Sequence, residues 1–238
     1  MLGMERLDKL LASQGTRSRS QIRQLIRSGA VAVNGQTVKK AELQIDPEKD
    51  RVTLEGHPIA IERHVYFMLH KPAGVVSATR DSRERTVLDL LPPELQRKGL
   101  FPAGRLDKDT EGFLLITDDG ELAHRLLSPK RHVTKTYEAI IDSPISQEDI
   151  DAFAKGIRIG EDLCRSAGLR VLEQGPNPKV EILLTEGLYH QIKRMFQARG
   201  KKVLYLKRTK MGPVRLDPSL KKGEVRALTE QEKKQLGI

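Results

Sequence analysis

A change in residue pattern near residues 56–62 divides the 238-residue chain into two parts. Before it, residues 5–13 and 18–28 place leucine and isoleucine three and four positions apart, which predicts two short amphipathic helices. The next stretch, AVAVNGQTV (30–38), carries an Asn-Gly pair between apolar alternations and predicts a β-hairpin. The N-terminal part therefore has the pattern of a small α+β module.

After the change, the apolar runs are short and rich in β-branched residues. The runs HVYFMLHKP, YEAII, VEILLT, VLYLKRT and EVRALT predict strands. Helices are expected at 121–128, 146–155, 188–199 and 229–236. We predict an α+β fold with a small N-terminal module over residues 1–58 and a larger domain with a mixed or antiparallel sheet over residues 59–238.

Positive charge is concentrated at two places that are far apart in the sequence. The net charge is +10, yet residues 1–40 contribute +6 and residues 190–226 contribute +10, so the remainder is about −6. Clustered positive charge binds polyanions, although solvated helix faces and a basic tail have the same composition. Neither segment has the pattern of a long amphipathic helix with large apolar anchors, so a membrane surface is not the expected partner.

Several other classes of protein lack support in the sequence. No apolar run approaches the roughly 18 residues that a membrane helix needs, and the N-terminus has no signal-peptide core. The single cysteine, Cys164, can form no internal disulfide, which is compatible with a cytoplasmic location. None of the six histidines stands in a known metal-ligand spacing, and neither a phosphate-binding loop nor GxSxG occurs.

The segment AGRLDKDTEGFLLITDDGEL (103–122) crowds acids into this basic chain. It has the pattern of a strand, a turn and a helix, in which Asp118 and Asp119 are expected to be turn and capping residues. Asp107 precedes the strand, and Arg105 stands two positions before it, where a guanidinium can hold a carboxylate ionised and oriented. From the residues alone, Asp107 is either a surface turn residue or a reagent.

Two other segments supply side chains that can converge on such an acid. KTYEA places Tyr137 at the start of a strand, and EGLYHQIKRMF places Lys193 and Arg194 early in a helix. A buried carboxylate, an aromatic ring and a cation suit an attack on a sugar or a base. The alternative is that Tyr137 belongs to the core and Lys193 to a solvated helix face.

These residues carry a resemblance to a known family. GRLDKDTEGFLLITDDGELAHRLLSPKRHVTKTYEA resembles the catalytic motif of the RsuA-type ribosomal RNA pseudouridine synthases. RLDKLLASQGTRSRSQIRQLIRSGAVAVNG resembles the S4 RNA-binding domain that this family carries before its catalytic domain. EGLYHQIKRMF and LYLKRTKMGPVRLDPSLKKGEVRALT resemble later motifs of the family. The resemblance implies an S4-like module followed by a pseudouridine synthase domain.

The resemblance also implies the site residues. The family's catalytic aspartate falls on Asp107, and the tyrosine that packs on the target base falls on Tyr137. The cation paired with the aspartate is commonly the arginine of a QIR motif; here the motif is QIK, which assigns that role to Lys193. Arg105 is expected to support the site, against the backbone of the flipped-out nucleotide.

Contacts with RNA are expected from the basic helices of the S4-like module and from the later motifs. The residues expected to bind RNA are Arg6, Lys9, Arg17, Ser18, Arg19, Arg23, Arg27, Arg194, Leu206 and Arg208. Within this set, Leu206 is expected to form an apolar wall near the base.

The expected reaction is the conversion of one uridine of 16S ribosomal RNA to pseudouridine by base flipping, with no cofactor and no metal. Asp107 would attack C1′ as a nucleophile or remove the 2′ proton to form a glycal, and the sequence leaves both routes open. The alternatives are a synthase for 23S ribosomal RNA and a non-catalytic rRNA-binding or ribosome assembly factor. The expected partner is ribosomal RNA, free or in an assembling small-subunit particle, and the protein is expected to be a cytoplasmic monomer.

Overall fold

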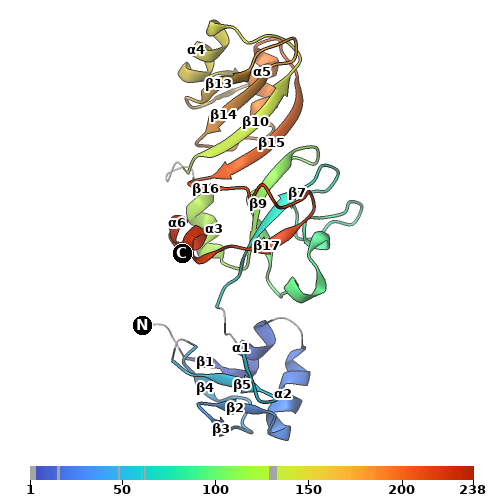
Figure 1. The fold of residues 1–238 in the computed structure, drawn as a ribbon, viewed down its shortest axis with the longest axis vertical. Helices are drawn as coiled ribbons and strands as arrows, with labels where there is room; N and C mark the ends of the chain where they lie inside the picture. The colour runs from blue at the N-terminus through green and yellow to red at the C-terminus, as the bar shows by residue number, and fades with distance from the viewer. Residues whose placement is uncertain (1–3, 15–16, 48, 60, 62, 129–132) are drawn as a thin grey trace. The chain divides into compact units, whose positions relative to one another are not determined.

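The structure, a computed structural model, describes residues 4–238 with the exception of 15–16, 48, 60, 62 and 129–132 (Figure 1). It divides into two compact units. Unit 1 comprises residues 1–65 and 91–100, and unit 2 comprises residues 66–90 and 101–238. The domain boundary predicted between residues 58 and 59 stays a prediction.

Unit 1 packs two helices, α1 (Leu7–Ser13) and α2 (Arg19–Ser28), against short strands through one apolar core. Four strands form an antiparallel sheet in the order β3-β2-β5-β6, and two more pair separately. The strands are β1 (Glu5–Arg6), β2 (Val31–Val33), β3 (Gln36–Thr37), β4 (Gln44–Ile45), β5 (Val52–Leu54) and β6 (His57–Ile59).

Local sequence signals set the ends of these elements. Ser18 and Gln21 form a reciprocal capping box at the start of α2, and Gly29 ends this helix in the left-handed region at φ +82°. Asn34 and Gly35 both have positive φ, +53° and +80°, as the two-residue turn of a tight hairpin requires. The predicted helices and hairpin of the N-terminal module are therefore confirmed.

Unit 2 is built on a mixed sheet to which its described residues contribute nine strands. The main order is β13-β14-β10-β15-β9-β7-β17, with β8 on β9 and β16 on β15. Only β9 and β15 pair in parallel within the described part of this sheet. The strands are β7 (Tyr66–Lys71), β8 (Phe101–Ala103), β9 (Glu111–Thr117), β10 (Lys135–Ile141), β13 (Gly168–Glu173), β14 (Lys179–Leu184), β15 (Val203–Met211), β16 (Val214–Arg215) and β17 (Val225–Ala227); β11 (Arg158–Ile159) and β12 (Asp162–Leu163) form a separate hairpin.

Helices pack on both halves of this sheet (Figure 1). They are α3 (Gly120–Leu127), α4 (Gln147–Lys155), α5 (Gln191–Ala198) and α6 (Glu230–Gln235). Leu122 of α3 and Leu236, just after α6, share a core with Phe113 of β9. Phe153 of α4 contacts Phe196 of α5, with ring centroids 4.9 Å apart. The predicted α+β class, a small module followed by a mixed sheet, is confirmed.

One close backbone approach positions the loop that precedes β9. Gly112 has φ +108°, and a Cβ atom at this residue would lie 2.2 Å from the carbonyl oxygen of Arg208 on β15. Because real Cβ atoms do not come this near to backbone oxygen, the parallel pairing of β9 with β15 requires glycine here. The pairing brings residues 104–110, directly before β9, beside β15.

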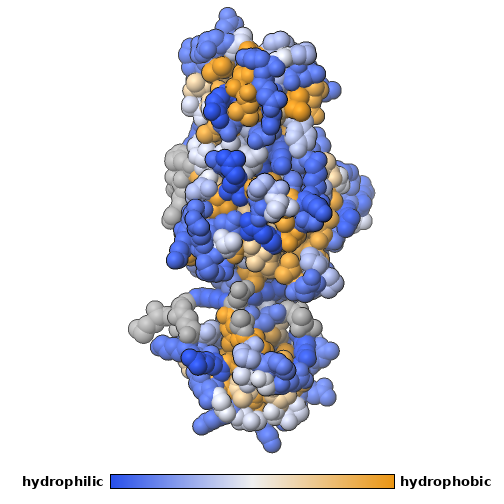
Figure 2. Space-filling model, in the orientation of Figure 1, coloured by the Kyte–Doolittle hydropathy of each residue, from blue (hydrophilic) through white to orange (hydrophobic). Residues whose placement is uncertain are grey.

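The visible face of each unit mixes hydrophilic residues with smaller apolar patches (Figure 2). Of the helices that the structure describes, none is both long enough and apolar enough to cross a membrane.

Candidate active site

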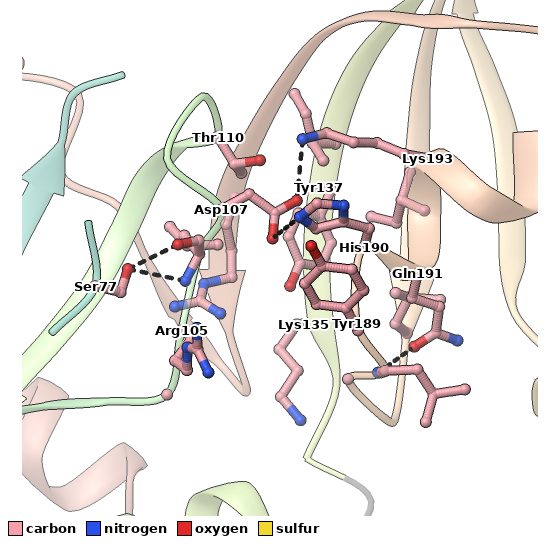
Figure 3. A pocket seen from close by; sticks show the side chains of 18 of the residues that line it. Ser77, Arg105, Asp107, Thr110, Lys135, Tyr137, Tyr189, His190, Gln191 and Lys193 are labelled. Carbon is pink, nitrogen blue, oxygen red and sulfur yellow. Dashed lines mark hydrogen bonds and ion pairs between the residues drawn. The ribbon is translucent and has the colours of Figure 1, made fainter. Parts of the chain in front are cut away.

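Unit 2 contains a cavity of about 930 Å³. Its walls are the loop 104–110, strands β10 and β15, and the loop 186–190 before α5 (Figure 3). Asp107 from the loop 104–110, Tyr137 from β10 and Lys193 from the start of α5 all line the cavity. The structure therefore brings together the acid, the ring and the cation that sequence patterns alone left as separate candidates.

Asp107 is a partly exposed carboxylate with two basic neighbours. Lys193 Nζ lies 3.0 Å from its Oδ2, and His190 Nε2 lies 3.6 Å from its Oδ1 (Figure 3). Arg105 also lines the cavity, but within the described part of the chain it forms no ion pair with Asp107. The cation that holds Asp107 is thus Lys193 from α5, and not the arginine two positions away in the sequence.

Lys193 is shared between two carboxylates. Its ammonium also donates to Oδ1 of Asp109, whose side chain is 73% exposed. Burial lowers the pKa of Lys193, but the hydrogen bonds to Asp109 and Asp107 outweigh burial, so this pKa lies above its ordinary value. Burial raises the pKa of Asp109, yet the hydrogen bond from Lys193 outweighs it and the pKa is lowered. Lys193 is therefore charged at neutral pH, as an electrostatic partner of Asp107 must be.

A fully buried lysine holds the loop that carries Asp107. Lys71, the last residue of β7, donates from Nζ to the carbonyl oxygens of Pro72 (3.0 Å), Asp107 (3.0 Å), Lys108 (3.2 Å) and Thr110 (2.9 Å). Burial lowers the pKa of Lys71 to about 8, against the effect of nearby carboxylates, so the ammonium form predominates at pH 7. One ammonium group thereby fixes the backbone from Asp107 to Thr110.

Strands β10 and β15 form one wall of the cavity. Tyr137 stands opposite Arg208 in their antiparallel register. Since side chains alternate along a strand, Lys135 and Tyr137 share a face with Leu206 and Arg208, and all four line the cavity. Tyr137 and Leu206 are buried, so each presents an edge of an apolar wall to the space in front of Asp107.

The loop before α5 holds a strained histidine. His190 has φ +48° and ψ +34°, a left-handed conformation that is uncommon outside glycine. Its ring stacks on the exposed ring of Tyr189, with centroids 3.8 Å apart and planes at 19°. Gln191 fixes the loop by donating to Glu186 at 2.6 Å and by accepting from the loop backbone. This geometry places the imidazole between Tyr189 and Asp107 (Figure 3).

Arg194, also expected to bind RNA, is not among the residues that line the cavity. Its Nη2 donates to the carbonyl oxygen of Ile159 at 2.8 Å, and its Nη1 donates to that of Tyr189 at 3.4 Å. These bonds connect α5 to the β11–β12 hairpin and to the loop before α5. Arg194 is therefore committed to the scaffold of the site in this structure.

In unit 1, a fully buried carboxylate gathers three arginines. Asp8 of α1 accepts hydrogen bonds from Arg6, from Arg19 and from Arg23, at 2.8–3.2 Å. Burial raises the pKa of Asp8, but the three arginines outweigh it and hold the pKa well below its ordinary range. Arg23 uses only Nε, so among the described contacts both of its terminal nitrogens stay without a protein partner. The three arginines form one cluster, which we name the Asp8 cluster.

The other basic candidates of unit 1 lie outside this cluster. Lys9 is exposed and lies 3.9 Å from Glu5, and Arg17 donates to Glu55 at 3.3 Å. Ser18 serves as the cap of α2, and Arg27 is exposed near the end of that helix.

Sequence patterns missed four residues that the structure connects with these sites. His190, Lys71 and Lys135 reach the cavity or its loop from segments distant from Asp107, and nothing in the sequence around Asp8 distinguishes it from a surface acid. Only Lys71 carries a local signal in the sequence: in HKP (70–72) a lysine ends an apolar strand, and a lysine that is buried there needs a hydrogen-bond partner. In the part of the chain that the structure describes, no three His, Cys, Asp or Glu side chains are grouped so that they could hold a metal ion.

The arrangement has a definite chemical capacity. The Asp107 carboxylate faces a cavity and has one oxygen paired with a charged lysine at 3.0 Å, while its other oxygen lies 3.6 Å from His190 Nε2 and can attack or remove a proton. The buried Tyr137 ring beside it offers a flat apolar surface to a planar heterocycle.

Comparison with family models matches residues 65–198 to the RNA pseudouridylate synthases and residues 5–52 to the S4 domain. An RNA pseudouridine synthase of Bacillus subtilis (strain 168) is 50% identical over 230 residues, which cover 95% of this chain and 96% of that protein. The ribosomal small subunit pseudouridine synthase A of Escherichia coli (strain K12) is 42% identical over 230 residues, 95% of this chain and 97% of that protein.

A solved structure gives the same result for the fold. A crystal structure of a pseudouridylate synthase superimposes with a TM-score of 0.68 and 40% sequence identity, and the match covers 97% of this chain and 99% of that one.

Proposed function

We propose, since the chain belongs to the RNA pseudouridylate synthase family, that its reaction is the conversion of one specific uridine of 16S ribosomal RNA to pseudouridine. The observation that carries the proposal is the Asp107 carboxylate, held 3.0 Å from Lys193 in a cavity that also contains Tyr137. The choice of the small-subunit RNA rests on the relative from Escherichia coli, which is named for that subunit. Ribosomal RNA as the substrate would place the enzyme in the cytoplasm.

The reaction needs no external energy source. The bond between C1′ and N1 of uridine breaks, the uracil turns, and a bond between C1′ and C5 forms; C5 then loses its proton and N1 gains one. Because a base inside an RNA stack is out of reach of a side chain, the target nucleotide must first leave the stack and enter the cavity. A cavity of about 930 Å³ has room for a nucleotide.

The residues that line the cavity have distinct roles in this reaction. Asp107 attacks C1′ or removes the 2′ proton, and both routes need its ionised form, which Lys193 stabilises. Tyr137 packs on the uracil ring, and Leu206 closes the apolar wall next to it. Arg105 reaches the cavity from the loop of Asp107, where its guanidinium meets the backbone of the extruded nucleotide.

The Asp8 cluster supplies part of the affinity for RNA. Arg19 and Arg23 stand one helical turn apart on α2 and hold their guanidinium groups in place through Asp8. Each phosphate contact releases counterions, so the affinity falls as salt rises. Loss of both arginines should make the slope of log affinity against log salt less negative by about 1–2. A titration of 16S RNA with Arg19→Gln/Arg23→Gln protein at several salt concentrations tests this, and an unchanged slope would show that these arginines do not contact phosphate.

The activity is tested by mapping pseudouridine with carbodiimide in ribosomal RNA from cells that lack the enzyme. The substrates are purified 16S and 23S RNA and small-subunit particles, each treated with wild-type, Asp107→Asn or Asp109→Asn protein. Asp109→Asn is the matched control, because this exposed acid also binds Lys193. We expect one new site in 16S RNA with the wild type and with Asp109→Asn, and none with Asp107→Asn.

Other outcomes correct the proposal in defined ways. A single new site in 23S RNA would keep the chemistry and replace the substrate. Activity with particles and not with purified RNA would assign the enzyme to ribosome assembly. No new site in any substrate, with folded protein that binds RNA, would favour the non-catalytic assembly factor.

A further inference from the structure

Two buried cations line the cavity without an acidic partner. Lys135 is 7% exposed and Arg208 is 2% exposed. Arg208 donates from Nε to the carbonyl oxygen of Phe113 at 2.8 Å, while its buried Nη2 has no hydrogen-bond partner among the described residues. Neither cation forms an ion pair with any side chain in the described part of the chain.

The sheet places both cations next to Tyr137. Tyr137 stands opposite Arg208 across the β10–β15 pair, and Lys135 lies two residues before Tyr137 on the same face. Burial lowers the pKa of Lys135, and the positive charge of Arg208 lowers it further. The two groups are thus near enough to repel each other, and both are directed to the same cavity.

Such a pair is unfavourable in the protein by itself. A buried charge without a partner is far less stable than a paired one, and apolar residues of similar volume would pack this wall better. The acids of the cavity do not relieve it: Asp107 is held by Lys193, Glu186 by Gln191, and Asp81 accepts from the backbone amides of Arg83 and Glu84. Altogether six lysines and arginines and three acids line the cavity, so its excess charge is positive.

We propose that Lys135 and Arg208 form a binding site for a phosphodiester group of the RNA, next to the nucleotide whose base packs on Tyr137. The inference rests on the proposed function for the identity of the nucleotide. Uracil carbonyl oxygens are neutral and would leave both charges uncompensated, whereas a phosphate neutralises one cation and accepts hydrogen bonds from both. Figure 3 shows the side chains of Lys135 and Arg105 on the side of the cavity away from Lys193. A phosphate bound at Lys135 would therefore lie apart from the reacting atoms beside Lys193.

A binding site of this kind makes a prediction that a structural role does not. Substitution of Lys135 by methionine removes a buried unpaired charge, so the thermal stability of the protein rises while its affinity for phosphate falls. If Lys135 instead supported the fold, the same substitution would lower the stability.

The experiment uses uridine, uridine 5′-monophosphate and uridine 3′-monophosphate as probes of the full-length protein. Binding is measured by nuclear magnetic resonance titration, and stability by thermal unfolding, for the wild type, Lys135→Met and Lys210→Met. Lys210 is the matched control, because a register shift between Thr136 and Tyr137 separates it from Arg208, so that it pairs with Thr136, and because it does not line the cavity. The two monophosphates show whether the site takes the 5′ or the 3′ phosphate.

We expect one monophosphate to bind the wild type at least about tenfold more tightly than uridine, the effect of one charge-assisted hydrogen bond. Lys135→Met should lose this difference and unfold at a higher temperature, and Lys210→Met should keep it. Equal binding of uridine and both monophosphates, or equal losses in the two variants, would overturn the inference. Because no probe is converted to product, a failure of the proposed activity would be seen separately, in the pseudouridine mapping.

Discussion

Lys71 and Lys135 are both buried lysines of unit 2, and the same substitution should affect them in opposite directions. The ammonium group of Lys71 donates to four carbonyl oxygens, whereas the ammonium group of Lys135 makes no hydrogen bond with the described residues. We expect Lys71→Met to destabilise the protein and to reduce the rate of pseudouridine formation. The reason is that methionine fills the space of the lysine stem but leaves its acceptors without a donor.

The loss of stability in Lys71→Met depends on how many carbonyl oxygens are left without any hydrogen-bond donor. The carbonyls of Asp107 and Lys108 also accept from the backbone amides of Thr110 (3.1 Å) and Gly74 (2.8 Å). Those of Pro72 and Thr110 depend on Lys71 among the described contacts. Two unsatisfied buried carbonyls cost about 2–6 kcal/mol, partly offset by removal of a buried charge, so we expect a net loss of about 3 kcal/mol.

A loss of this size lowers the unfolding temperature of a unit of this length by about 10 °C. Thermal unfolding followed by circular dichroism measures it, with Lys135→Met as the control that should move upward. Hydrogen exchange of the segment 105–112 reports whether the loop itself is released. At a temperature where the variant stays folded, displacement of Asp107 by about 1 Å should reduce single-turnover pseudouridine formation about 100-fold.

The reasoning is refuted if Lys71→Met unfolds within 2 °C of the wild type and keeps its rate. That result would mean that water replaces the ammonium group at all of its acceptors. Equal destabilisation by Lys71→Met and Lys135→Met would refute the contrast between a hydrogen-bonded and an unpaired buried lysine.

Three further predictions concern other residues. Lys193→Met should lower the single-turnover rate about 100-fold with little change in RNA affinity, and equal losses in both would argue against its pairing with Asp107. Gly112→Ala should destabilise unit 2 by about 3 kcal/mol or more, because its Cβ would meet a backbone oxygen at 2.2 Å; a normal melting curve would contradict the tight β9–β15 contact. Folding lowers the pKa of Asp8, so the ionised carboxylate stabilises unit 1. This stabilisation is complete above the unfolded pKa of about 4 and is lost as the pH falls below that value. Asp8→Asn should therefore destabilise unit 1 by about 1–2 kcal/mol at pH 7 and lose less stability than the wild type on acidification, and identical acid profiles would exclude this role.

Much of the fold was predictable because its signals are local. The capping box of Ser18 and Gln21, the Asn-Gly turn and the alternation of apolar residues act within a few positions, and these elements were predicted close to where they occur. Asp119 caps α3 by accepting from the amide of Leu122, as its position before a helix indicated. Glu111 differs: it has the sequence context of a turn residue, yet it begins β9, where it binds Tyr205 and Lys222.

The site was predictable only in part. Nearness in sequence suggested Arg105 as the partner of Asp107, and the family resemblance suggested Lys193; in the structure the partners are Lys193 and His190. Two residues in an irregular loop need not direct their side chains toward each other. Contacts across more than 80 positions depend on how the sheet is ordered, and no periodic pattern encodes that order.

The sequence by itself determined the elements, the class of fold and the chemical type of the important side chains, because each depends on neighbours along the chain. Only the tertiary structure decided which charges have partners. Lys71 and Asp8 are buried and fully engaged, while Lys135 and Arg208 are buried and face a cavity. In the sequence all of these residues are simply charged. Their difference arises from burial and from the groups within hydrogen-bond reach, and both are properties of the folded chain.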